Sequence, residues 1–336
     1  MPTIQLKNMI KKEKALYKDG RKNPNGYKNN PFDIFEKKWI PIALSVLIPM
    51  ALVVSVLEAF NVTSWNKIFS SVGIIDGTQV ADENFVVYCL DVGQSDCTVI
   101  VCDDTVMMID TGTSNQVYNI RTSLYTLGIE KIDYMVITHP HDDHMSGASY
   151  LIENYNVSNI LMPSLSYENR VTTQTYFNLL DSITKYNVNP IAVSAGDSFN
   201  LGSSCVEILS PSKQDDDLNN MSVVIKITYG NTEMLFQGDS DSSIEKQLLM
   251  SDYDISADLI KVGHHGSNTS SYATFLDAVD PEYAIISSGS DNNYGHPNTY
   301  VIERLEERNI KPYITSLNGD ITIISDGNDL FIKTEK

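Results

Sequence analysis

Short apolar runs, each bounded by turn residues, dominate the chain from residue 84 onward. The first runs are rich in β-branched residues and are bounded by Asp, Asn and Gly, a pattern typical of β-strands. A wholly apolar run before a polar loop further indicates a buried strand. The sequence predicts strands at 85–90, 97–101 and 106–109, a helix at 115–127 and a buried strand at 134–137.

The rest of the chain repeats this order of strands and helices. Helical periodicity predicts helices at 148–155, 172–186, 243–250, 272–279 and 299–308. Apolar runs predict strands at 206–209, 223–227, 233–236, 258–262 and 283–287, with three further short strands up to residue 332. Two blocks of strands, each followed by helices, predict an α+β fold in which two sheets pack together and helices cover the outside.

A different pattern precedes residue 84, where the segment from Trp39 to Leu57 carries no charge and follows two lysines. Its length suits a bilayer-spanning helix, and the excess of Lys and Arg before it favours an N-terminus inside the cell. A cleaved signal peptide and a buried soluble helix are alternatives, but the first lacks a clear cleavage site and the second a polar face. We predict a basic cytoplasmic tail at 1–38, a single-pass transmembrane anchor at 39–60, a linker at 61–83 and an extracytoplasmic domain at 84–336.

The formal net charge of −19 is unevenly distributed along the chain. Residues 1–38 hold ten Lys and Arg against four Asp and Glu, whereas the remainder holds 14 against 39. An acidic body repels polyanions, so no stable complex with nucleic acid is expected. The four cysteines lack Cys-x-x-Cys spacing, which favours buried free thiols, although an extracytoplasmic location leaves disulfides open.

Three histidines and one aspartate lie within six residues, directly after the buried strand predicted at 134–137. A proline and two aspartates end that strand, so the segment 138–147 is expected to be a loop. Imidazole and carboxylate are ligands that divalent zinc, manganese and iron prefer in proteins. The four residues are His139, His141, Asp143 and His144. The first two can reach one ion from the same side of the loop, and the last two a neighbouring ion.

The His-x-His-x-Asp-His pattern after a strand resembles the metal-binding signature of the metallo-β-lactamase fold. Further motifs follow in the order found in the branch that contains the extracytoplasmic hydrolase domain of the competence protein ComEC. They are Leu90–Asp96, Ile109–Gly112, Gln237–Asp239, Lys261–Ser267 and Tyr294–Pro297. The resemblance covers roughly residues 84–334 and implies an αββα sandwich of two mixed sheets flanked by helices. The chain departs from the family at Ser95, where Gly is usual, and at 219–222, where a third histidine ligand is missing.

The resemblance also implies a centre of two divalent ions, Zn²⁺ or Mn²⁺, and roles for residues around it. The implied ligands are His139, His141, Asp143, His144, Asp239 and His264. Asp239 would bridge the ions, while Asp110 and Asp91 would support the ligands from behind. His264 directly follows a predicted strand and is preferred over His265 as the last ligand, because successive residues leaving a strand point in different directions. The predicted catalytic residues are Asp143, His265 and His296. Asn220 and Ser267 are predicted to contact the substrate, the latter within an anion cradle of hydroxyl and backbone N–H groups at 267–271.

Two neighbouring ions lower the pKa of a bound water, which predicts attack of a metal-bound hydroxide on phosphorus. We therefore predict a membrane-anchored, outward-facing phosphodiesterase or nuclease that acts on DNA or an envelope phosphoester. Hydrolysis of choline-phosphate or teichoic-acid-type esters is one alternative, and a non-catalytic envelope scaffold is another. The missing third histidine weakens the first metal site, favours Mn²⁺ over Zn²⁺ there, and disfavours β-lactam hydrolysis.

Overall fold

The computed structural model describes residues 84–165 and 171–336. The predicted tail, membrane anchor and linker at 1–83 lie outside the described residues. Within the described ranges, no helix has the length and apolar character needed to cross a membrane.

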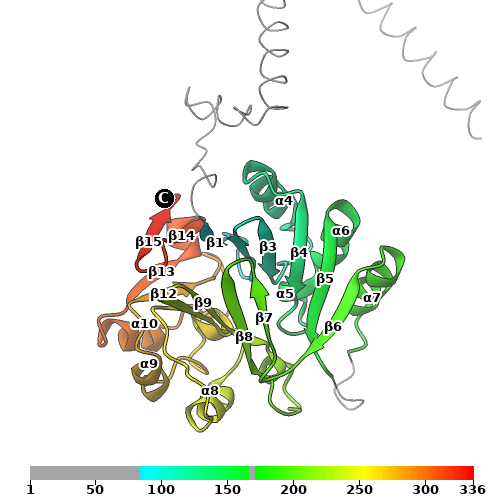
Figure 1. Ribbon diagram of the computed structural model, residues 1–336. Coiled ribbons are helices and arrows are strands. Elements are labelled where there is room, and N and C mark those ends of the chain that lie inside the picture. Colours follow the sequence, from blue (N-terminus) through cyan, green and yellow to red (C-terminus); the bar gives the residue numbers. More distant parts are fainter. Residues whose placement is uncertain (1–83, 166–170) are drawn as a thin grey trace, which may run out of the picture. The chain divides into compact units, whose positions relative to one another are not determined.

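Two mixed β-sheets form the domain (Figure 1). The first sheet has the strand order β15-β14-β1-β2-β3-β4-β5-β6, in which β3 to β6 run parallel and the remaining neighbours antiparallel. Its strands are β1 (Phe85–Cys89), β2 (Thr98–Cys102), β3 (Thr105–Ile109), β4 (Lys131–Val136), β5 (Asn156–Pro163), β6 (Asn189–Val193), β14 (Ile321–Ser325) and β15 (Leu330–Thr334).

The second sheet has the order β13-β12-β11-β10-β9-β8-β7, with β10 to β13 parallel and the rest antiparallel. Its strands are β7 (Ser198–Leu201), β8 (Ser204–Ser210), β9 (Val224–Tyr229), β10 (Thr232–Phe236), β11 (Leu259–Lys261), β12 (Tyr283–Ile286) and β13 (Lys311–Ile314). Both sheets therefore contain a parallel half, and loops of both halves supply the polar cluster described below.

Three apolar layers hold the sandwich together. The central layer packs one sheet on the other, with Val87 and Ile100 from the first sheet and Ile225 and Phe236 from the second. Helices α8 (Ser242–Leu249), α9 (Ala273–Val279) and α10 (Thr299–Glu306) cover the outer face of the second sheet. Helices α4 (Val117–Thr126), α6 (Ala148–Asn154) and α7 (Gln174–Lys185) cover the outer face of the first. The predicted αββα arrangement of two mixed sheets and flanking helices is confirmed.

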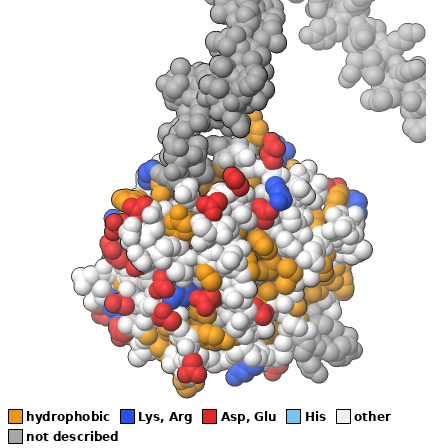
Figure 2. Space-filling view, in the orientation of Figure 1, with side chains coloured by type: hydrophobic (Ala, Val, Ile, Leu, Met, Phe, Trp, Pro, Cys, Tyr) orange, Lys and Arg blue, Asp and Glu red, His pale blue; other side chains and the backbone are white. Residues whose placement is uncertain are grey.

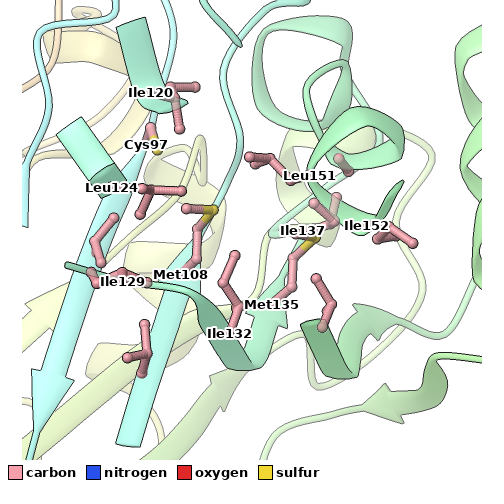
Figure 3. Close-up of a cluster of buried hydrophobic side chains, with 14 of the residues drawn as sticks. Cys97, Met108, Ile120, Leu124, Ile129, Ile132, Met135, Ile137, Leu151 and Ile152 are labelled. Atoms are coloured by element: carbon pink, nitrogen blue, oxygen red, sulfur yellow. The ribbon is translucent and has the colours of Figure 1, made fainter. Parts of the chain in front are cut away.

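Strand β1 shows why this sequence forms a layer buried on both sides. Successive side chains of a strand point to opposite faces. Val86 and Tyr88 accordingly enter the layer under α4, α6 and α7, whereas Phe85, Val87 and Cys89 enter the central layer. The outer layer is drawn in Figure 3, where Ile120 and Leu124 of α4 and Leu151 and Ile152 of α6 lie over Met108, Ile132 and Met135 of β3 and β4. A strand covered on both faces has no polar positions, so it appears as a continuous apolar run.

Three strands were not predicted, namely β5, β6 and β7. The first half of β5 carries Asn156, Ser158 and Asn159, which resemble loop residues. Strands β6 and β7 are edge strands with mostly exposed or half-exposed residues, and β6 contains Pro190. Edge strands tolerate proline and polar residues because one side forms no ladder hydrogen bonds.

Candidate metal centre

Of the four histidine and aspartate positions after β4, Asp143 and His144 lie on a short helical turn, α5 (Asp142–Met145), which the sequence did not predict. His139 and His144 are completely buried. The Nε2 atom of His139 lies 3.0 Å from the Nδ1 atom of His141, so both ring nitrogens face the same point. Asp143 lies across the cluster with its Oδ2 atom 3.8 Å from His144 Nε2. The loop therefore presents donors on two sides of one point.

Asp110 holds this loop from behind. One of its oxygens accepts the backbone N–H of Thr138 at 2.8 Å, and the other accepts the Thr138 hydroxyl and the His144 Nδ1–H, each at 2.8 Å. Asp110 sits at the end of β3 with a left-handed φ of 59°, a conformation that costs energy in a residue with a Cβ atom. The three hydrogen bonds fix the loop and the orientation of one histidine ring. This geometry is that of the supporting role expected for Asp110.

Asp239 leaves β10 through Gly238 and reaches the centre of the cluster. Gly238 has a φ of 55°, and a Cβ atom built there would lie 3.0 Å from side-chain atoms of Ser222 and Thr138. Only glycine fits both the conformation and the space. The Ser222 hydroxyl accepts the backbone N–H of Asp239 at 3.0 Å. Asp239 is thus placed by a tight turn on which two other loops pack.

The sequence Gly-His-His-Gly after β11 also borders the cluster and forms a 3₁₀ turn over Gly263–Gly266. Both histidines are left-handed, with φ of 53°. His265 is 2% exposed, and its Nε2 atom lies 3.3 Å from Asp143 Oδ2 and 3.6 Å from Asp239 Oδ2. The side chain of His264 is 26% exposed, and its Nε2 atom lies 3.9 Å from Asp239 Oδ2.

Four residues could together hold one ion, because their donor atoms all lie within 4.8 Å of one another. They are Asp143, His144, Asp239 and His265. The group contains His265 in place of His264, which differs from the predicted assignment. The prediction assumed that side chains alternate after the strand, and the left-handed backbone at 264 and 265 breaks this alternation.

His144 and His265 each use one ring nitrogen in a hydrogen bond and turn the other ring nitrogen towards Asp239. Nδ1 of His144 donates to Asp110 at 2.8 Å, and Nδ1 of His265 donates to the backbone oxygen of Ser287 at 3.1 Å. Within the described residues, the buried atoms His144 Nε2, His265 Nε2 and Asp239 Oδ1 have no hydrogen-bond partner. Buried polar atoms without partners are costly, and a shared cation would satisfy all three. The donor set therefore fits a divalent metal ion.

The carboxylates and rings of the cluster shift one another's pKa values. Burial alone would raise the pKa of Asp239, but His144 and His265 outweigh it and hold that pKa well below its usual value. Burial alone would likewise raise the pKa of Asp143, but the neighbouring rings of His265 and His144 lower it to about 2. Burial lowers the pKa of His139 well below its usual value, so the ring stays neutral. Burial alone would lower the pKa of His144, but Asp239 and Asp110 outweigh it and raise that pKa well above its usual value. A cation at Nε2 of His144 would take the place of the proton that these carboxylates favour.

Where the family has a third histidine, Asn220 and Ser222 take up other contacts. The Asn220 amide oxygen accepts the backbone N–H of Asp241 at 3.3 Å, and the Ser222 hydroxyl lies 3.4 Å from His139 Nδ1. These side chains brace the loops around His139. The contact of Asn220 with a substrate stays a prediction.

One predicted supporting residue, Asp91, has contacts other than those expected. The Asp91 carboxylate accepts hydrogen bonds from the backbone N–H of Gly93 and from the Lys336 ammonium group. The backbone N–H of Asp91 donates to Asp320. The anion cradle at 267–271 stays a prediction; one of its N–H groups, that of Ser271, donates to the buried carboxylate of Glu245, as does the next N–H along the chain, that of Tyr272.

Ser267 nevertheless belongs to the site through an indirect contact. Its hydroxyl accepts the Thr269 hydroxyl at 3.1 Å, and Thr269 Oγ1 in turn lies 3.2 Å from His264 Nδ1. The Thr269 oxygen therefore accepts the His264 Nδ1–H, and Nε2 of His264 is left as a proton acceptor on the more exposed side of the cluster.

Sequence reasoning missed a buried ion pair beneath the cluster. Lys261 donates to both oxygens of Asp96, at 2.8 and 2.9 Å, and Asp96 Oδ1 lies 3.9 Å from His265 Nδ1. Asp96 and Asp91 belong to the same motif. The fold brings the carboxylate of Asp96, and not that of Asp91, to the site. The only available signal was a lysine within an otherwise apolar strand, because a buried lysine requires a partner.

Comparison with known proteins places these observations in a family. The sequence matches the Metallo-beta-lactamase superfamily over residues 90–290. It is 30% identical to ComE operon protein 3 of Bacillus subtilis over 195 residues, which are 58% of this chain and 25% of that protein. It is 40% identical to Competence protein ComA of Neisseria gonorrhoeae over 116 residues, 34% of this chain and 17% of that protein. Recombination protein 2 of Haemophilus influenzae is 29% identical over 253 residues, 73% of this chain and 29% of that protein.

The chain thus spans less than a third of the length of each of these relatives. Among solved structures, the diiron β-hydroxylase CmlA from Streptomyces venezuelae superposes with a TM-score of 0.52 and 15% identity, covering 77% of this chain and 59% of that one. At this identity the likeness concerns the fold alone.

Proposed function

Because the chain belongs to the metallo-β-lactamase superfamily, we propose that it is a two-metal hydrolase that cleaves phosphodiesters, with a nuclease of the ComEC type as the favoured form. The observation that carries the proposal is the group of four donors around Asp239, with its unpartnered ring nitrogens and carboxylate oxygen. The sequence relatives named as a competence protein and a recombination protein favour DNA as the substrate.

The donors divide into two sets that share Asp239. His139 Nε2, His141 Nδ1 and Asp239 would hold the first ion, which has fewer protein ligands than the second. Asp143, His144, Asp239 and His265 would hold the second ion. We therefore exchange the roles predicted for the two neighbouring histidines, with His265 as a ligand and His264 beside the substrate.

Bound at these donors, two divalent ions would activate a water for attack and neutralise charge on the phosphoryl oxygens. The chain's own residues prepare the surroundings of that reaction. Asp110, Thr138 and Ser222 fix the ligand rings, so that no reorganisation is needed when charge develops. His264 Nε2 can accept a proton on the open side of the cluster, because its Nδ1 is committed to Thr269.

Membrane attachment is part of the proposal and rests on the sequence of residues 1–60 alone. The uncharged stretch from Trp39 to Leu57 and the preceding lysines support a single-pass anchor with the domain outside the cell.

A second substrate class is favoured by one observation, the acidic surface. Asp and Glu side chains are spread over the face shown in Figure 2, with few Lys or Arg side chains among them. Such a surface repels a polyanion but not a small zwitterionic ester. Of the alternative substrates predicted above, the acidic surface therefore favours choline-phosphate esters, because teichoic acids are themselves polyanions.

The test uses the full chain, purified in detergent and assayed for metal by elemental analysis. It is then offered single-stranded DNA, a generic aryl phosphodiester and a choline phosphodiester, each with Mn²⁺ or Zn²⁺. Two ions per chain and hydrolysis of a phosphodiester support the proposal, and the preferred substrate separates the two classes. A chain without metal that hydrolyses none of them would instead be a scaffold that kept the fold.

A further inference from the structure

The motif Leu90–Asp96 contains a residue that the catalytic scheme does not use, Gln94. It lies in the turn after β1, and its side chain reaches the loop after β12. Its amide oxygen accepts the backbone N–H of Gly289 at 3.1 Å, and its amide nitrogen lies 3.4 Å from His296 Nδ1. The two segments approach closely, since a Cβ atom built on Gly289 would lie 2.9 Å from the backbone nitrogen of Gln94.

These two contacts determine which nitrogen of His296 carries the proton. The oxygen and nitrogen of an amide are distinguished by their partners. Gly289 N–H can only donate, so the Gln94 atom that faces it is the oxygen and the atom that faces His296 is the NH₂ group. An NH₂ group donates, so His296 Nδ1 must accept. The neutral ring therefore carries its hydrogen on Nε2.

The ring of His296 is placed where that hydrogen can be used. It stacks between the ring of Tyr294, with centroids 5.7 Å apart, and that of His265, at 6.5 Å, and it meets the edge of His264 at 5.8 Å. Asn292 fixes the backbone, since its side chain accepts the N–H of His296 and donates to the His296 oxygen. No described residue hydrogen-bonds the Nε2 atom. A held ring beside the cluster, with one free N–H, suits an anionic oxygen.

We propose that Gln94 is a positioning residue that fixes His296 in the tautomer with hydrogen on Nε2, so that His296 donates a hydrogen bond to a phosphoryl oxygen of the substrate. This inference rests on the proposed function for the identity of the acceptor, but not for the tautomer. His264 then offers a proton acceptor and His296 a proton donor at neighbouring points of the rim. In this arrangement neutral His296 is not the acid that protonates a leaving group, because it shares its Nε2 hydrogen with the phosphoryl oxygen in a hydrogen bond and does not transfer it.

The tautomer can be measured directly. In the Zn²⁺-loaded full chain with isotopically labelled histidine nitrogens, proton–nitrogen correlation spectra distinguish protonated from unprotonated ring nitrogens. The signals of His296 are identified by their loss in His296→Gln. We expect a protonated Nε2 and an unprotonated Nδ1. A proton on Nδ1, alone or in an imidazolium ring, overturns the proposal.

The variant Gln94→Glu keeps the shape of the side chain but replaces the NH₂ donor that faces His296 with an acceptor oxygen. A carboxylate accepts from both Gly289 and His296, so the turn keeps its contacts while Nδ1 becomes protonated. At alkaline pH, where the ring is neutral, Nε2 then loses its hydrogen and turnover should fall roughly ten- to hundredfold, the usual value of a hydrogen bond to a charged group. Gln174→Glu, on the exposed first turn of α7, makes the same charge change far from the motif and should leave turnover unchanged.

The outcomes separate this inference from the proposed function. An unprotonated Nδ1 in Gln94→Glu, or unchanged turnover in that variant despite a protonated Nδ1, contradicts the role given to Gln94. A wild-type chain that hydrolyses no phosphodiester contradicts the proposed function, whereas the spectra still decide the tautomer.

Discussion

At the scale of single residues, the exchange of roles between His264 and His265 gives the first prediction. His265→Ala should lower the metal content from two ions towards one, because its buried Nε2 belongs to the four-donor group. His264→Ala should keep both ions and lose roughly 10²–10⁴ in turnover, the range for a lost acid or base. Metal content and turnover are measured on the same preparations. Loss of an ion in His264→Ala but not in His265→Ala would restore the assignment first made from the sequence.

A second prediction concerns Asp110, whose oxygens accept three hydrogen bonds. In Asp110→Asn an NH₂ group must face one of these donors, so metal affinity should fall by about 10–100-fold, as for other supporting residues. Asp133→Asn is the matched control, because Asp133 accepts a backbone N–H from Val106 at the other end of the same strands. It should cost stability but leave metal affinity unchanged in a metal titration. Equal effects of the two variants would show that Asp110 acts only on the fold.

The residues that the sequence reveals are those whose chemistry is local. His139, His141, Asp143 and His144 lie in one short segment, so their spacing alone shows that they converge. The partition of His264 and His265 depends on two left-handed φ angles, which no side-chain pattern encodes. Asp96 and Lys261 are separated by 165 positions, so their pairing exists only once both sheets have formed.

At the scale of elements, the exit of β10 depends on Gly238. Gly238→Ala places a methyl group 3.0 Å from Ser222 and Thr138 in a left-handed conformation. We expect a loss of roughly 2–4 kcal/mol in unfolding free energy, from backbone strain and crowding together, and a loss of metal. Gly327→Ala is the control, because its φ is also positive while its nearest neighbour is 3.8 Å away. It should cost only the backbone part, about 1–2 kcal/mol. Chemical denaturation measures both variants, and equal losses would mean that crowding at Gly238 is negligible.

The junction of α8 and α9 gives a prediction about pH. Glu245 on α8 is buried and accepts the N–H groups of Ser271 and Tyr272 before α9. Burial nevertheless raises its pKa above the usual 4.5, so folding favours the neutral form. Its contribution to stability is therefore greatest below pH 4.5 and is lost as the pH rises through the raised value.

Glu245→Gln removes this titration and serves as the reference. The unfolding free energy of the wild type minus that of Glu245→Gln should fall between pH 4.5 and neutrality, by no more than about 1.4 kcal/mol per pH unit. Urea denaturation at several pH values gives the difference, in which titrations of the metal centre cancel. A difference that grows with pH would show that the hydrogen bonds to Glu245 from Ser271, Tyr272 and Gln237 outweigh its burial.

The elements that were predicted and those that were missed differ in burial. Strand β1, which is covered on both sides, is an apolar run that local pattern identifies. Strands β6 and β7 are formed by pairing at sheet edges, and their exposed positions accept the polar residues of loops. Their existence is set by the neighbouring strand, which a local window does not contain.

At the scale of the whole molecule, the contact pattern divides the chain after Asp76. All site residues lie in the unit that begins at Gly77, so a chain that begins there should fold, remain soluble without detergent and keep full turnover. In intact cells, added protease should degrade this domain of the full chain. Degradation only after lysis would refute the outward orientation, and loss of folding in the shortened chain would refute its independence.

The acidic charge of the domain makes a prediction that separates its substrates. Residues 39–336 hold 14 Lys and Arg against 39 Asp and Glu, so at low ionic strength a polyanion is repelled before it reaches the metals. Raising the salt to about 0.15 M shortens the screening length to about 8 Å, and kcat/KM for a single-stranded oligonucleotide should rise by roughly tenfold. A small choline phosphodiester has no net charge to be repelled, so its kcat/KM should change little. Proteins that bind DNA through basic surfaces show the opposite dependence, because salt competes with their phosphate contacts. If cleavage of the oligonucleotide falls as salt is added, the strand must reach the site along basic side chains of the domain itself.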